Sequence, residues 1–215
     1  MSEEFSFGLL CFVSLFAVVE PLGTMPIFMA LTADMEPAQS RSVAIRAVLI
    51  AWLLLLLFTF LGQLIFSLFG INVNSLKVVG GVIFFIIGYE MLQARLSSTA
   101  FQQVAPQEYG RDIALTPLGI PMIAGPGAIA NVMILWTKAD TLGRQVAMLV
   151  GMSAVLLLTG LVLVGSRRVA KILGDSGNKV LLRLMGLITM VIAVEFFFSG
   201  LKPIVRDILA IPQEA

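Results

Sequence analysis

The sequence predicts an all-α membrane protein with six transmembrane helices, built as two inverted three-helix repeats in which helices one and four are discontinuous. Three observations lead to this prediction: an apolar composition, six segments of membrane-spanning length, and matched proline–glycine breaks. Of 215 residues, 59% are hydrophobic and 13% are charged, and the mean hydropathy is +1.00. A soluble domain of this size cannot bury so much apolar side chain, so its surface must be apolar.

The six apolar segments are each long enough to cross a hydrocarbon core of about 30 Å. They cover residues 5–31, 47–69, 73–92, 113–136, 146–164 and 180–201. A polar stretch, 94–112, has no apolar periodicity and is typical of a linker. We therefore expect one membrane domain over 1–215, with repeat one at about 5–93 and repeat two at about 113–205.

Basic residues predict the orientation. The connections between segments one and two, three and four, and five and six hold nine of them with their flanks, and the other side holds five. The positive-inside rule places the nine in the cytoplasm and both termini in the periplasm.

The two halves resemble each other in motif order. "EPLGTMPIF" (20–28) matches "TPLGIPMIAGPGAI" (116–129), and "SLKVVGG" (75–81) matches "LLRLMGL" (181–187). Each half has three crossings, an odd number, so the second half must enter the membrane from the opposite side. Many secondary transporters are built this way, with the substrate at the repeat interface where matching helices are broken.

Proline inside a helix removes a backbone N–H, and irregular backbone survives in lipid only where protein buries it or water reaches it. We expect Pro126 to restart a helix, leaving the N–H groups of Gly127, Ala128 and Ile129 free for a carboxylate. Pro26 is expected to do the same in segment one. The alternative is that both breaks are ordinary kinks that only shape helix packing.

Two carboxylates lie within apolar segments. Glu20 directly precedes Pro21 near the middle of segment one, at the expected C-terminus of a half-helix, where burial and the helix dipole both disfavour its charge. Glu20 and Glu195 are therefore candidates for proton or cation coupling. The alternative for each is a structural glutamate, protonated or paired with a buried donor.

Several function classes lack the residues they need. There is no histidine, Cys11 is the single cysteine, and no basic run is present. We expect no enzyme activity, no metal site, no cofactor and no nucleic-acid partner. The expected partners are the lipid bilayer and a small-molecule substrate, with H⁺ or Na⁺ as a possible coupling ion; the oligomeric state stays open.

The motifs "EPLGTMPIF", "LKVVGG", "PLGIPMIAGPGAI" and "RLMG" resemble the MarC family (UPF0056-type) of multi-pass membrane proteins, within the wider LysE-like superfamily. The resemblance implies a bacterial inner-membrane location. It also implies kinship with SnatA transporters of small neutral amino acids, in which discontinuous helices one and four form the site. Many relatives have Asn or Asp where this chain has Glu20, whose side chain is longer.

The candidate substrate-binding residues lie at the two breaks. The resemblance implicates the prolines, glycines and small residues there, and three neutral hydrogen-bonding side chains join them from the sequence itself. Together they are Pro21, Gly23, Thr24, Pro26, Thr116, Pro121, Gly125, Pro126, Gly127, Ala128 and Asn131.

The expected function is secondary transport of a small neutral solute, foremost a small neutral amino acid, by alternating access. Two alternatives remain open from the sequence. One is a channel or exporter of another small metabolite, and the other is a non-transporting structural or regulatory membrane protein.

Overall fold

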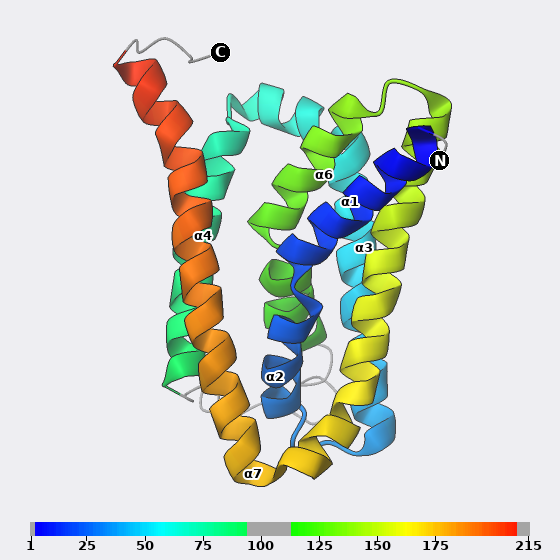
Figure 1. The fold of residues 1–215 in the computed structure, drawn as a ribbon, viewed down its shortest axis with the longest axis vertical. Coiled ribbons are helices and arrows are strands. Elements are labelled where there is room, and N and C mark those ends of the chain that lie inside the picture. The colour runs from blue at the N-terminus through cyan, green and yellow to red at the C-terminus, as the bar shows by residue number, and fades with distance from the viewer. Residues whose placement is uncertain (1–2, 94–112, 210–215) are drawn as a thin grey trace.

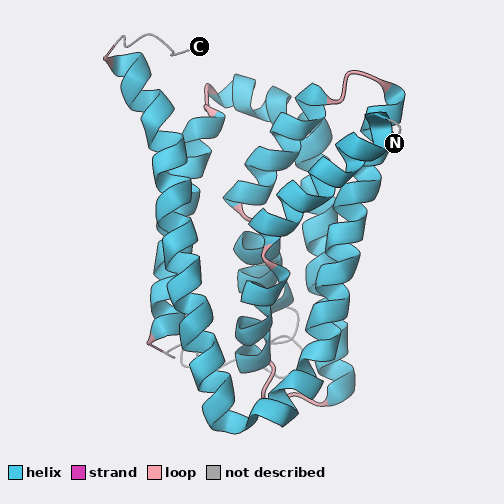
Figure 2. Ribbon diagram, in the orientation of Figure 1, coloured by secondary structure: helices cyan, strands magenta, loops and turns pink. Residues whose placement is uncertain are grey.

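The structure is a computed structural model that describes residues 3–93 and 113–209. These residues form helices and, within those two ranges, no strand (Figure 2). The predicted linker 94–112 lies outside the described residues. The helices are α1 (Glu3–Val19), α2 (Pro21–Leu31), α3 (Pro37–Phe69), α4 (Val73–Leu92), η1 (Ala114–Ile123), α6 (Pro126–Lys138) and α7 (Leu142–Ile208), shown in Figure 1.

Five stretches are long and apolar enough to span a membrane: Glu3–Leu31, Pro37–Phe69, Val73–Leu92, Leu142–Gly174 and Ser176–Ile208. The pair η1 and α6, bent by 52° at its break, makes a sixth if it counts as one span. The prediction of an all-helical membrane protein is confirmed. Several helices run past the predicted apolar segments because polar residues extend them beyond hydrocarbon depth; α3, for example, begins at Pro37 behind Glu36.

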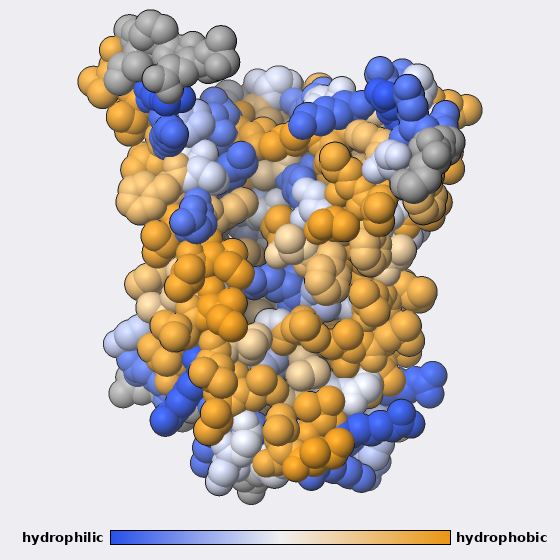
Figure 3. Space-filling view, viewed as in Figure 1, coloured by the Kyte–Doolittle hydropathy of each residue, from blue (hydrophilic) through white to orange (hydrophobic). Residues whose placement is uncertain are grey.

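Burial follows the pattern of a protein solvated by lipid. One face of α3 is buried through small residues such as Ala44, Ala47 and Ala51, which recur every three or four positions. Large leucines point outward, and Leu53 is 60% exposed. On the face drawn in Figure 3 the middle of the molecule is mostly apolar, with a few hydrophilic atoms in it, and most hydrophilic residues gather toward the two ends.

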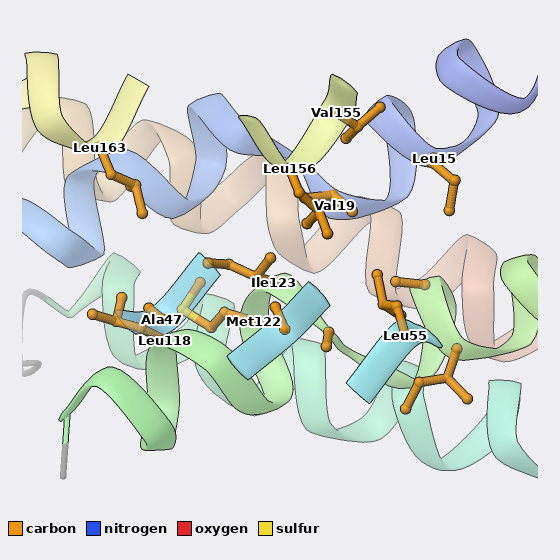
Figure 4. Packing of buried hydrophobic residues seen from close by; sticks show 14 of the residues in the cluster. Leu15, Val19, Ala47, Leu55, Leu118, Met122, Ile123, Val155, Leu156 and Leu163 are labelled. Carbon is orange, nitrogen blue, oxygen red and sulfur yellow. The ribbon is translucent and has the colours of Figure 1, made fainter. Parts of the chain in front are cut away.

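The core lies between α1, α3, η1, α6 and the first half of α7. Leu15 and Val19 of α1 meet Leu156 of α7 and Ile123 of η1 in one cluster of buried side chains (Figure 4). The end of α1 and the end of η1 are therefore held in the same packed region.

The second half of α7 packs along α4 through glycines. A Cβ built on Gly88 would lie 2.8 Å from the carbonyl oxygen of Gly186, and one built on Gly186 would lie 2.7 Å from the carbonyl oxygen of Gly88. Only residues without a side chain permit two backbones to approach so closely. This contact makes α4 and the second half of α7 a tight pair, seen side by side in Figure 1.

The two spans of α7 meet at Gly174 without an intervening loop. Its backbone angles are φ 64° and ψ −178°, a region that is essentially restricted to glycine. The helix turns a corner there, at the lower end of Figure 1.

Candidate functional site: two helix starts at mid-span

The first break lies between α1 and α2, at Glu20. Pro21 has no N–H to continue α1, and it disfavours the right-handed helical conformation in the residue before it. Glu20 instead adopts φ 47° and ψ 63°, and it is the one non-glycine residue with positive φ in the described ranges. Such a conformation costs about 1–2 kcal/mol and is often found at functional sites.

The second break lies between η1 and α6. Thr116, Ile120 and Gly125 each precede a proline and each has an extended backbone, which makes η1 a wide, irregular helix and ends it before α6. Pro126 then begins α6, as predicted.

The two restarted helices begin in the same way. In each, proline is the first helical residue and the preceding carbonyl accepts the first helical hydrogen bond. Thr24 N donates to Glu20 O at 3.0 Å, and Ile129 N donates to Gly125 O at 3.0 Å. Within the described ranges no acceptor pairs with the N–H groups of the second and third helical residues, which are Leu22 and Gly23 in α2, and Gly127 and Ala128 in α6.

Both helix starts lie near mid-height of the molecule, with α2 running toward one end and α6 toward the other (Figure 1). The N-terminus of a helix carries a partial positive charge. The fold therefore places two positive helix ends midway along the candidate spans, and both have donors without an acceptor among the described residues.

The breaks lie close to each other. A Cβ built on Gly127 would lie 2.6 Å from Cγ1 of Val18, at the end of α1, and 3.0 Å from Cζ of Phe196, in α7. Val18 and Phe196 therefore cover the start of α6. Gly127 and Ala128 themselves are buried.

A hydrogen-bonded pair ties α1 to α6 about two turns away from the breaks. Asn131 Nδ2 donates to Ser14 Oγ at 3.0 Å, and Ser14 Oγ lies 3.3 Å from Asn131 Oδ1. Asn131 thus lies near the candidate site, as predicted, although its amide already has a protein partner.

The side chain of Glu20 folds over the first turn of α2. A Cβ built on Gly23 would lie 3.4 Å from Glu20 Oε2. Glu20 directly follows the last residue of α1, as the sequence predicts, and its N–H still donates to Phe16 O at 3.1 Å. It is also the N-cap of α2, so its half-buried carboxylate lies beside the positive start of that helix as well.

Two predictions about the donors are wrong. Pro26 does not restart a helix, because α2 already begins at Pro21 and Pro26 is buried inside it. The Ile129 N–H is not free, because it makes the first hydrogen bond of α6. Thr24 is buried, and its hydroxyl donates to Glu20 O at 3.2 Å. This hydroxyl, predicted to bind substrate, therefore already has a backbone partner at the break.

Five of the remaining predicted residues lie together at the helix starts, and the others lie elsewhere. Pro21, Gly125, Pro126, Gly127 and Ala128 are buried at the two helix starts.

Thr116 and Glu195 lie elsewhere. Thr116 is exposed in η1, and Pro121 is half-buried one turn later. Glu195 lies on an exposed face of α7 and, among the described residues, has no buried donor as partner.

Sequence reasoning missed Phe196 and Ser14. Phe196 belongs to the run "EFFFSG" (195–200), where nothing distinguishes the one ring that faces the break from its neighbours. Ser14 offered a weak signal, as a small polar residue two turns before the first break.

Residues 5–205, nearly the whole chain, match the family described as "MarC family integral membrane protein". The chain belongs to the MarC family. Two of its relatives are UPF0056 membrane proteins of bacteria.

YvbG of Bacillus subtilis is 40% identical to the MarC chain over 201 residues, which cover 92% of this chain and 95% of YvbG. YhcE of Escherichia coli is 30% identical over 204 residues, covering 92% of this chain and 93% of YhcE. An archaeal relative from Methanocaldococcus jannaschii is 30% identical over 200 residues, covering 93% of this chain and 98% of the relative. No solved structure matches this MarC protein.

Proposed function

We propose that this protein is a secondary transporter of a small neutral solute, foremost a small neutral amino acid, that binds where α2 and α6 begin. The observation that carries the proposal is the pair of equivalent helix starts at mid-span. Each begins on a proline, and each leaves two N–H groups without an acceptor in the described part of the chain. Paired half-helix ends of this kind are typical of substrate sites in transporters.

The charges around the two helix starts favour a zwitterion. The start of α2 already has the Glu20 carboxylate beside it, whereas no acidic side chain from residues 3–93 or 113–209 caps the start of α6. We infer that a substrate carboxylate binds the N–H groups of Gly127 and Ala128. The substrate ammonium would then bind Glu20, across the short span occupied by Val18.

Close packing at the start of α6 favours small substrates. Gly127 has no room for a methyl group next to Val18 and Phe196, and we infer that these side chains move when glycine or alanine binds. In this proposal the movement of Val18 and Phe196 is part of alternating access between the two inverted repeats. The transporter would lie in a bacterial inner membrane with both termini in the periplasm, and it would have no enzyme activity.

The test is uptake by the purified full-length protein in liposomes. Labelled glycine, alanine and serine would be offered under proton or sodium gradients, and we expect saturable uptake of at least one of them. The absence of saturable uptake for all three would overturn the substrate class. A broad flux that does not saturate would indicate a channel instead.

The site is tested by Gly127→Ala, with Gly165→Ala as the matched control. The new methyl group would collide with Val18 at position 127, whereas a Cβ at Gly165 meets no atom within 4 Å. We expect Gly127→Ala to lower the initial uptake rate about tenfold, the effect of about 1.4 kcal/mol on a barrier. Gly165→Ala should transport like the unmodified protein, and equal rates for the two variants would remove Gly127 from the site.

A further inference from the structure

A polar cavity of about 650 Å³ lies where α4 begins and α7 approaches its C-terminus. Lys202 and Arg206 line it, together with the single carboxylate of Asp207 and the neutral side chains of Asn72 and Ser75. Among the described residues, none of these charged groups forms an ion pair. The cavity therefore has an excess of unpaired positive charge at the end of a membrane span.

An apolar groove of about 240 Å³ lies deeper along the same helix pair. Its walls are Val82 and Phe85 of α4 and Ala193, Val194 and Phe198 of α7, with glycine at Gly81. No polar side chain lines it, and its residues lie in the interior of the spans Val73–Leu92 and Ser176–Ile208.

The cavity and the groove lie along matching helix faces. Val194, Phe198 and Lys202 follow one another at intervals of four residues, so they share one face of α7. On α4 the exposed Val79 connects Ser75, which lines the cavity, to Val82, which lines the groove. Lys202 lies about 6 Å along the axis from Phe198.

We propose that the pair formed by α4 and the second half of α7 binds one lipid with an acidic phosphate headgroup. The headgroup would lie in the polar cavity against Lys202 and Arg206, and an acyl chain would fill the groove between Val82 and Phe198. A free anion would use only the cavity, and a zwitterionic lipid such as phosphatidylcholine would bring its choline cation close to Lys202 and Arg206. An anionic lipid alone fits both the unpaired cations and the apolar wall at hydrocarbon depth.

The test measures lipid retention by the purified full-length protein in detergent, using native mass spectrometry with phosphatidylglycerol and phosphatidylcholine. We expect phosphatidylglycerol to be retained and phosphatidylcholine to be lost. Each basic residue near a membrane surface strengthens anionic lipid binding by about fivefold. The double variant Lys202→Gln, Arg206→Gln should therefore weaken phosphatidylglycerol binding by about 25-fold.

Lys138→Gln is the matched control, since Lys138 is an exposed lysine at the end of α6 and does not line the cavity. It should bind phosphatidylglycerol like the unmodified protein. Equal retention by the double variant and by Lys138→Gln, or equal retention of the two lipids, would overturn the proposal. Thermal unfolding without added lipid should be the same for both variants, which separates lost binding from lost folding.

The groove is tested by Val82→Trp, which fills it from the exposed side of α4. This variant should lose long-chain phosphatidylglycerol, whereas its affinity for inorganic phosphate should equal that of the unmodified protein. If inorganic phosphate or a short-chain phosphatidylglycerol binds as tightly as the long-chain lipid, the acyl chain contributes nothing and the site is one for free anions.

Discussion

At the scale of single residues, Glu20 has both a strained backbone and an acidic side chain within a candidate membrane span. Its backbone is left-handed, and its carboxylate lies beside the start of α2 in the membrane interior. A regular helix would avoid both costs, so the packing of α1 and α2 on their neighbours must maintain this conformation.

The backbone strain at Glu20 predicts different effects for two substitutions. Asn tolerates the left-handed region, whereas a β-branched side chain does not. Glu20→Val should therefore lower the free energy of unfolding by about 1–2 kcal/mol relative to Glu20→Asn. Thermal unfolding in detergent measures the difference, and equal midpoints would mean that position 20 is not held left-handed in the protein.

The residue scale also shows where sequence reasoning ends. Pro21 and Pro26 both precede apolar stretches, and both are able to interrupt a helix. Only Pro21 does so, because Met25 keeps a helical conformation before Pro26 whereas Glu20 leaves it. Pro26 is buried inside α2, and nothing in the local sequence distinguishes it from Pro21.

At the scale of elements, the contact between α4 and α7 depends on glycine. Glycine within an apolar helix is typical of close helix contacts, so the sequence predicts such contacts for Gly80, Gly81, Gly88, Gly186 and Gly200. At each of these positions an added Cβ would lie within 3.0 Å of another element, which confirms that prediction. The sequence shows that a glycine in a membrane span can make a close helix contact, but it does not show which helix lies on the other side of that contact.

Gly88→Ala tests this contact, with Gly160→Ala as control. A methyl group at position 88 would overlap the backbone of the Gly186 turn, and overpacking of this kind costs about 1–3 kcal/mol. At Gly160 the nearest atom is 3.6 Å away, an ordinary contact. We expect Gly88→Ala to unfold at a lower temperature and Gly160→Ala to unfold no earlier than the unmodified protein; the reverse order would contradict the packing.

At the scale of the whole molecule, composition predicted the helical membrane fold, because so apolar a surface is stable only in lipid. The inverted repeat stays a prediction. Its motif alignment pairs Pro-Leu-Gly with Pro-Leu-Gly, yet the equivalent helix starts are Pro21 and Pro126, which that alignment does not match. Short motifs in apolar helices recur too easily to define a register between the two halves.

The orientation predicted from basic residues is also testable on the whole molecule. Leu142 is 77% exposed and Ile172 is 84% exposed, at opposite ends of the first span of α7. In a Cys11→Ser background, which removes the single native thiol, we expect an impermeant maleimide to label Leu142→Cys in intact cells. Ile172→Cys should react only after permeabilisation, and the opposite result would place both termini in the cytoplasm.

The corner at Gly174 has a mechanical consequence. A loop would let the two spans of α7 move independently, but here the helix passes from one to the other through a single pair of torsion angles. The first span packs on α1 through Gly151 and Gly8, and the second carries Phe196 to the start of α6. The corner thus connects, with no loop between them, the span that packs on α1 and the span whose Phe196 ring lies against the start of α6.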